Sequence, residues 1–469
     1  MNTIETALNQ IGFGKFHITL IAILAGHSGI FGFQISCVTL LGPVLSCYWK
    51  LNVKEVFIFN TVMFTGMIFG SLFLGKLSDK FGRKPVLIMS NCVCIYCSLM
   101  AIISPNIYWL AIFQFMIGVF IVGIPITIFP FFFEWSPIKY RVVFIGISMC
   151  AFGIGGLIGN LLGYAIIPRF GWRIFILACP LLTIFLSVFI FQIPESPRYL
   201  LLNKGRFDCL RAMNIVAKWN RAESIKDIYE PPVTKSNIKD LIHPNYFSTT
   251  LFISFISLAV YLIYYSIVLA IPIIANVPHR CLQNWSQFSN VQNLKNNRIV
   301  DDSCCMKLDI ENYKNMLIST SAEIISVPLY LFLITVIGRK KTLSVLIFII
   351  MIGVSLLNLC LNLLQLNILL FIIRGISNLN FNLITIYASE IFPTSVRSSG
   401  MGITSGCGRI GGVLSPLIAT IIIFKYSFLM GTMILFGFSF VCFCMSFLLP
   451  YETVNQDLQQ TAADRNKSN

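Results

Sequence analysis

The stretch FFFEWSPIKYR, residues 131–141, recurs with the same spacing of key residues as YASEIFPTSVR at residues 387–397. Both copies place a glutamate, a proline and an arginine at equal intervals: Glu134, Pro137 and Arg141, then Glu390, Pro393 and Arg397. The same offset of 256 residues maps Gly82-Arg83-Lys84 onto Gly338-Arg339-Lys340, and Gly155-Gly156 onto Gly411-Gly412. Blocks that share one offset, with apolar sequence between them, predict a membrane unit that occurs twice in the chain.

The composition is that of an integral membrane protein. Of the 469 residues, 56% are hydrophobic and 11% are charged, whereas average soluble chains carry about 25% charged residues. The apolar residues fall into blocks of about 20, the length of a helix that crosses a hydrocarbon core of about 30 Å. Because backbone polar groups have no water partner in that core, these blocks are expected to span it as helices.

Twelve blocks are expected to be transmembrane helices of an all-α membrane protein with two parallel six-helix repeats. Their approximate ranges are 17–41, 53–74, 85–103, 107–130, 142–167, 172–192, 247–275, 316–336, 342–361, 366–386, 399–423 and 427–449. They predict an N-terminal bundle (1–192), a cytoplasmic linker (193–246), a C-terminal bundle (247–450) with a lumenal loop (276–315), and a cytoplasmic tail (451–469). The lead before the first block lacks a cleavable-signal pattern, so we expect that helix in the mature protein.

The net charge of +15 indicates topology rather than a nucleic-acid partner. Basic residues gather in the connections of one side and in the linker, which predicts that both termini and the linker are cytoplasmic and that the bilayer is the main partner. No segment combines a nucleophile, a base and an acid, and no metal-ligand spacing occurs, so neither an enzyme nor a metal site is predicted. The glycine-rich runs follow no strand, so no nucleotide cofactor is predicted.

Most of the 15 cysteines lie in apolar blocks, where buried cysteine behaves as a small apolar residue. The exceptions are Cys281, Cys304 and Cys305 in the lumenal loop and Cys47 at the outer end of the first block. A disulfide from Cys281 to one of the later pair is expected in an oxidising lumen, with the connectivity open. The triplet Asn284-Trp285-Ser286 in this loop is a glycosylation acceptor sequence.

Motifs at the basic connections predict two matching gates on the cytoplasmic side. In GKLSDKFGRK, residues 75–84, Asp79 paired with Arg83 or Arg141 would form an ion pair that breaks on switching. Each Glu–Arg pair spans a proline that ends a helix, so the carboxylate can reach basic residues of the adjoining turn. The alternative is solvated charge at a plain turn. The predicted gating residues are Asp79, Arg83, Lys84, Glu134, Arg141, Arg339, Glu390 and Arg397.

Ionisable residues inside the membrane blocks are few, and each is a functional candidate. Glu323 could pair with Arg374 or Arg409, as a static brace or as a switchable element beside a substrate, and His27 could relay protons or simply hydrogen-bond. Aromatic and amide groups on the seventh and tenth blocks suit an organic solute or cation, or hydrogen bonds between helices. The predicted substrate contacts are His27, Gln34, Tyr261, Tyr264, Tyr265, Glu323, Arg374 and Asn378.

These motifs resemble the major facilitator superfamily over nearly the whole chain. The decapeptide, the paired Glu-x-x-Pro-x-x-x-Arg and PESPR (194–198) match its sugar-porter and organic-ion-transporter branch, and IGFGKF (11–16), CYWKL (47–51) and 387–400 are similar to synaptic vesicle two-related proteins. The resemblance implies a twelve-helix, alternating-access carrier for small organic solutes or ions, in the plasma membrane or in vesicles. We expect a monomer.

Two departures from the family pattern bear on coupling. Gln114 stands where the fourth helix of such carriers usually has an arginine, and Phe31 and Gln34 stand where the vesicle relatives have acidic residues in the first helix. Uniport, or coupling through Glu323 or His27, is therefore favoured over coupling at those positions. The alternative function is a transporter-like vesicle membrane protein that binds a ligand or partner without net transport.

Overall fold

The computed structural model describes residues 4–137, 140–228, 244–274, 308, 310–359, 361–392, 397–449 and 452. Within helices, the side chains of 142, 244–246, 273–274, 389, 397–399 and 424–426 also fall outside this description. The predicted disulfide cysteines Cys281, Cys304 and Cys305 and the predicted glycosylation site Asn284 lie outside the described residues.

The described ranges are almost entirely helical. The first part of the chain forms α1 (Ile4–Ile11), α2 (Lys15–Tyr48), α3 (Val53–Phe81), α4 (Arg83–Ile102), α5 (Ile107–Ile121), α6 (Gly123–Trp135), α7 (Arg141–Phe170), α8 (Trp172–Ile190), α9 (Pro197–Asn203) and α10 (Arg206–Asn220). The second part forms α11 (Pro244–Ile274), α13 (Ile310–Val336), α14 (Arg339–Leu356), α15 (Leu363–Ile391), α16 (Arg397–Pro416), the π-helix η5 (Leu417–Tyr426) and α17 (Phe428–Phe447).

The prediction of twelve membrane helices is confirmed. Among the described residues, 11 spans are long and apolar enough to cross a membrane, with α5 and α6 joined into the single span Ile107–Trp135. The helix of the ninth block is α14, which has 18 residues and begins with Arg339, Lys340 and Lys341. These three charges lower its apolar character because the first turn belongs to the basic interface rather than to the hydrocarbon core.

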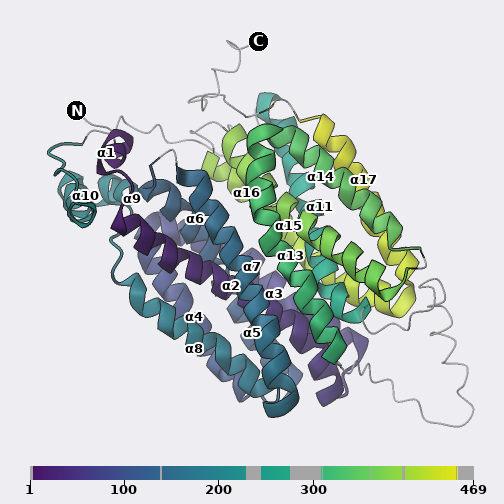
Figure 1. The fold of residues 1–469 in the computed structure, drawn as a ribbon. Helices are drawn as coiled ribbons and strands as arrows, with labels where there is room; N and C mark the ends of the chain where they lie inside the picture. Colours follow the sequence, from purple (N-terminus) through teal and green to yellow (C-terminus); the bar gives the residue numbers. More distant parts are fainter. Residues whose placement is uncertain are drawn as a thin grey trace, which may run out of the picture.

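The two repeats have the same internal packing. In the first repeat (α2–α8), α2 packs against α7, α3 against α5 and α4 against α8. In the second repeat (α11–α17), α11 packs against α16, α13 against α15 and α14 against α17, which are the same three pairs by position. Figure 1 shows the purple-to-blue helices of the first repeat beside the green-to-yellow helices of the second. Parallel duplication is therefore visible in the packing as well as in the motifs.

The seam between the repeats consists mainly of α7 against α13 and α3 against α16. Gly146, near the start of α7, lies beside Leu331, near the end of α13. At the other end, the rings of Tyr164 and Tyr313 are 5.9 Å apart. The two helices are therefore antiparallel, which places the start of α7 and the end of α13, and with them both repeated motifs, at the same end of the molecule.

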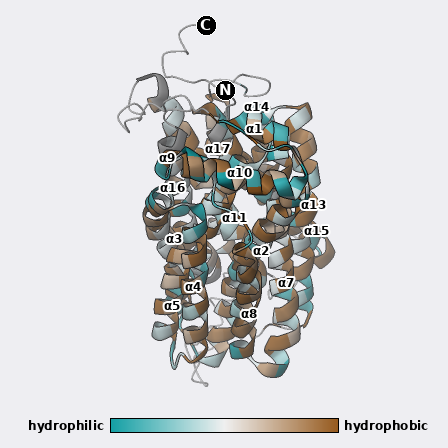
Figure 2. Cartoon of the chain, turned by 90° about the vertical axis from the view of Figure 1, so that its left-hand side faces the viewer, coloured by the Kyte–Doolittle hydropathy of each residue, from teal (hydrophilic) through white to brown (hydrophobic). Residues whose placement is uncertain are grey.

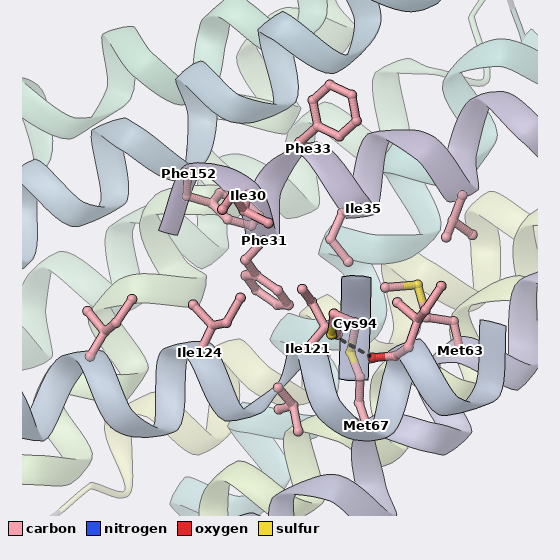
Figure 3. Packing of buried hydrophobic residues seen from close by; sticks show 14 of the residues in the cluster. Ile30, Phe31, Phe33, Ile35, Met63, Met67, Cys94, Ile121, Ile124 and Phe152 are labelled. Carbon is pink, nitrogen blue, oxygen red and sulfur yellow. Dashed lines mark hydrogen bonds between the residues drawn. The ribbon is translucent and has the colours of Figure 1, made fainter. Parts of the chain in front are cut away.

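Apolar side chains fill the space between the helices of the first repeat. Figure 3 shows Phe31 of α2 near Ile121 and Ile124, with Met63 and Met67 of α3 close by. The Cys94 thiol lies 4.0 Å from the carbonyl oxygen of Ile117. Hydrophobic residues cover α4, α5 and α8 along their length, whereas hydrophilic residues gather at α1 and α10 (Figure 2). Buried Cys94 thus serves as a small packing residue, as the sequence predicted for the membrane cysteines.

Two predicted helices are interrupted by prolines. Pro125 has no N–H for the carbonyl of Ile121, and α5 ends at that residue before α6 begins at Gly123. Pro416 likewise leaves the carbonyl of Gly412 without its helical donor, and the Ser415 hydroxyl donates to that carbonyl at 2.7 Å. The π-helix η5 starts directly after Pro416. The eleventh block is therefore an α-helix followed by a π-helix.

Helix α1 lies outside the membrane blocks and was not predicted from the sequence. Its Ile4, Ala7, Leu8 and Ile11 are all buried, and their spacing places them on one helical face. Figure 1 shows α1 beside α9 and α10 at one end of the bundle. A helix of eight residues gives a weak sequence signal, because isolated helices of that length are unstable without tertiary contacts.

Candidate functional site

The first predicted gate joins α3, α4 and α6. Arg83 donates from Nη2 to Glu134 Oε1 at 3.1 Å and from Nη1 to the Ser78 carbonyl at 3.1 Å. Asp79 Oδ1 lies 3.5 Å from Arg83 Nη1, but its side chain is 74% exposed. Of the two partners considered for Asp79, the structure gives Arg83, and an exposed pair of this kind adds little stability. Glu134, which is buried, is the main partner of Arg83.

Glu195 closes the same network from the end of the first repeat. Its carboxylate accepts hydrogen bonds from the backbone N–H groups of Arg83 at 3.1 Å, Lys84 at 3.1 Å and Ser196 at 2.8 Å. Two of these donors are orphan N–H groups at the start of α4. Burial raises the pKa of Glu195, against the effect of these N–H donors. Lys84 Nζ in turn donates to the carbonyls of Phe191 at 3.2 Å and Ile193 at 2.7 Å.

The second gate repeats the main contacts of this network. Arg339 Nη2 donates to Glu390 Oε1 at 3.2 Å, as Arg83 does to Glu134. Glu452 accepts from the backbone N–H groups of Arg339 at 2.5 Å and Lys340 at 3.1 Å, as Glu195 does at α4. Lys340 Nζ donates to the carbonyls of Phe447 at 3.1 Å and Leu449 at 2.6 Å. Each repeat therefore ties the start of its third helix to its fourth helix and to the end of its sixth.

Arg141 does not join the first network through Asp79. Its Nη2 lies 3.3 Å from Glu5 Oε1 on α1, and Arg198 Nη2 lies 3.1 Å from the same oxygen. Glu5 therefore connects the start of α7 to the start of α9. Neither this contact nor α1 itself was predicted from the sequence. The side chain of the predicted gating residue Arg397 lies outside the described residues, so its role stays a prediction.

We expect Glu195→Ala to destabilise the protein by about 1–3 kcal/mol, the usual cost of leaving buried donors unsatisfied. The variant removes the acceptor of the Arg83 and Lys84 N–H groups. The measurement is the thermal midpoint of the purified chain in detergent, with Glu223→Ala as the matched control because Glu223 is exposed on the linker. An equal midpoint for both variants would contradict the capping role.

A second group of polar residues lies at mid-membrane in the second repeat. Arg374 Nε donates to Glu323 Oε1 at 2.8 Å, and the Tyr264 hydroxyl donates to the same oxygen at 3.0 Å. Arg374 Nη1 reaches the Ser319 hydroxyl at 3.2 Å, and Asn378 Nδ2 reaches the Glu323 carbonyl at 3.4 Å. Of the two arginines considered for Glu323, the structure therefore gives Arg374. Both charged side chains are at most 6% exposed.

Aromatic rings continue this group toward the first repeat. The Phe381 ring centroid lies 4.3 Å from that of Tyr261 and 5.3 Å from that of Tyr264. The Tyr265 ring centroid lies 4.7 Å from that of Phe64 of α3, across the seam between the repeats. Six predicted substrate contacts are thus brought together on α11, α13 and α15: Tyr261, Tyr264, Tyr265, Glu323, Arg374 and Asn378.

The other two predicted substrate contacts lie apart. The His27 ring contacts its own helix, with Nδ1 2.8 Å from the Ile23 carbonyl. Gln34 Oε1 accepts from the Cys179 thiol of α8 at 3.0 Å, inside the first repeat. In the part of the chain that the structure describes, no hydrogen bond joins either residue to the Glu323 group.

Other contacts refine the predictions. Asn160 of α7 donates a hydrogen bond to the Thr320 hydroxyl of α13 at 2.7 Å, and this bond connects the first repeat to the second. Asn380 lines a cavity of about 10 Å³ and lies on another face of α15 than Asn378, because residues two apart on a helix do not share a face. Cys47 is disulfide-bonded. The predicted pairing of Cys281 falls outside the described ranges.

A family model described as "Major Facilitator Superfamily" matches residues 24–282 and 315–468. The chain is 30% identical over 466 residues to the human "Putative transporter SVOPL", covering 98% of this chain and 93% of that protein. It is 28% identical over 466 residues to the Xenopus laevis "Synaptic vesicle 2-related protein", covering 98% of this chain and 82% of that protein.

Two solved structures share the fold. The "Inward open conformation of the xylose transporter XylE from E. coli" has a TM-score of 0.65 at 14% identity and covers 94% of this chain and 98% of its own. The "Crystal structure of D-xylose-proton symporter" has a TM-score of 0.66 at 13% identity and covers 95% of this chain and 100% of its own. At these identities the likeness concerns the fold alone.

Proposed function

This chain belongs to the major facilitator superfamily, in its synaptic vesicle 2-related branch, and on that basis we propose that it is a secondary carrier that moves a small organic solute or ion by alternating access. As a member of this family it is a multi-pass membrane transporter. The solute class and the rocking mechanism are the proposed part. The observation that carries the proposal is the pair of matching networks, Arg83 with Glu134 and Glu195, and Arg339 with Glu390 and Glu452.

The networks support rocking because the ion pairs and hydrogen bonds described for them each join helices of one repeat. Each is built from hydrogen bonds to charged groups, which contribute about 1.5–3 kcal/mol apiece. The seam itself carries apolar contacts and few polar ones, such as Asn160 to Thr320 at 2.7 Å. A carrier of this kind needs rigid halves and a seam that can part on either side of a central site.

The orientation and location belong to the same proposal. Basic connections at the gate end support a cytoplasmic placement for the gates, the linker helices α9 and α10, and both termini. In this arrangement residues 1–192 move against residues 247–450. A relative named "Synaptic vesicle 2-related protein" supports a vesicle membrane, with the plasma membrane as the other location.

We expect the double variant Glu134→Gln plus Glu390→Gln to lose solute exchange by tenfold or more, since each substitution removes a carboxylate that pairs with an arginine. The measurement is counterflow in proteoliposomes with labelled carboxylates, quaternary amines and sugars. Glu223→Gln, on the exposed linker, is the matched control. Wild-type protein that exchanges none of these solutes would remove transport from the proposal, and thermal stabilisation by a solute without exchange would favour a binding protein that does not transport.

A further inference from the structure

Arg409 is a membrane-depth cation for which the described residues supply no counter-charge. It lies 12 residues into α16, about 18 Å along a helix from the first turn, which is near the middle of a bilayer core. Its side chain is partly buried. Arg409 Nε is buried without a hydrogen-bond partner, and no carboxylate of the described ranges lies within ion-pair distance of the guanidinium.

The one mid-membrane carboxylate near this region is already engaged. Glu323 accepts from Arg374 at 2.8 Å and from the Tyr264 hydroxyl at 3.0 Å, so that pair is neutral as a unit. Tyr261 and Tyr265 lie close enough to Arg409 to interact with it electrostatically, but tyrosine side chains carry no charge at neutral pH. The guanidinium is not stacked over either ring among the described cation–π contacts. Among the described residues at this depth, Arg409 is therefore left as a positive charge without a counter-charge.

This charge lies at the seam where a solute would pass. On either side of Arg409 along α16, Gly408 lies against Tyr261 and Gly412 lies against Phe64 and Tyr265. Phe64 belongs to α3 of the first repeat, so this part of α16 packs against both α3 and α11. Aromatic rings of both repeats therefore lie against the α16 residues that flank Arg409.

We infer that Arg409 binds the anionic group of the transported solute and that the solute class is an organic anion with an aromatic or broad apolar body. The anion would supply the missing counter-charge, and its body would pack against Tyr261, Tyr265 and Phe64. Buried charges occur where they are paired, and a charge left unpaired in a membrane marks a functional site. The inference rests on the proposed carrier function and makes it specific, because a lone cation disfavours a cationic solute.

The test measures binding to the purified full-length chain with matched probes. The probes are benzoate, 1-naphthoate and benzenesulfonate, each paired with its uncharged amide, together with benzyltrimethylammonium. We expect at least one acid to bind tenfold or more tightly than its amide, the preference that a charge-assisted hydrogen bond provides. In Arg409→Gln the affinities for the acid and for its amide should differ by no more than about twofold. Arg409→Lys should retain part of the preference for the acid because the positive charge remains.

The controls separate binding from folding. Arg409→Gln removes an uncompensated buried charge, so its thermal midpoint without solute should equal or exceed that of the wild type. Arg211→Gln makes the same exchange on the exposed face of α10 and should leave the acid preference unchanged. Acids that bind no better than amides, or a preference that survives Arg409→Gln, would show that the inference is wrong.

Counterflow with the same probes distinguishes this inference from the proposed function. Acid binding that depends on Arg409, without any exchange, would support the anion site and contradict the carrier. Exchange of amines or sugars, without a preference for acids, would support the carrier and contradict the anion site.

Discussion

Replacing Glu323 with alanine is expected to lower the free energy of unfolding by about 3–5 kcal/mol, the usual cost of leaving a buried charge without its partner. Arg374 is 5% exposed and would lose the acceptor that lies 2.8 Å from its Nε, and the Tyr264 hydroxyl would lose the same acceptor. With Arg409 this would leave two uncompensated cations in one membrane-embedded region. The measurement is denaturant or thermal unfolding of the purified chain in a fixed detergent.

The double variant Glu323→Met plus Arg374→Leu tells a brace from a solute contact. Replacing both members of a buried ion pair by apolar residues of similar size is often neutral or stabilising. If the pair is a brace, the double variant should regain stability and solute exchange together. Stability that returns without exchange would show that the pair contacts the solute. If Glu323→Ala unfolds at the same midpoint as the wild type, the pair is neither a brace nor a solute contact of the kind described.

Gly155→Ala is expected to destabilise the first repeat by about 1–3 kcal/mol or more, the range for inserting atoms into a packed core. A methyl group at Gly155 would overlap the carbonyl oxygen of Gly29, so the backbones of α2 and α7 would have to move apart. Gly411→Ala should cost a similar amount, because its methyl group would overlap the carbonyl oxygen of Leu258 between α11 and α16.

The matched control for this prediction is Gly437→Ala on α17. Nothing lies within 4 Å of the position that its methyl group would take. Alanine is the better helix former by up to about 1 kcal/mol, so this variant should be as stable as the wild type or more so. Thermal midpoints of the three variants give the comparison, and equal midpoints for Gly155→Ala and Gly437→Ala would contradict the close approach of α2 and α7.

The amino-acid sequence by itself determined the membrane helices, their duplication and the end of the molecule at which the gates lie. A bilayer core of fixed thickness demands apolar blocks of about 20 residues, and such blocks are readable without a structure. The shared offset from Arg83 to Arg339 and from Glu134 to Glu390 is likewise a property of the chain, and the structure gives both pairs as ion pairs. Short-range rules failed only for α1 and at the prolines.

Only the tertiary structure decided which charges meet. From the sequence, Glu323 could pair with Arg374 or Arg409, and Asp79 could pair with Arg83 or Arg141. The structure gives Glu323 with Arg374 and Asp79 with Arg83, and it places Arg141 beside Glu5 on a helix that the sequence did not reveal. Gln34, a predicted substrate contact, accepts a hydrogen bond from the Cys179 thiol, a partner that the sequence did not reveal. Ion pairs and hydrogen bonds require atoms within about 3–4 Å, and whether two side chains come that close depends on how each helix is rotated and inclined against its neighbours. Packing of the complete bundle sets those angles, and no single segment encodes them.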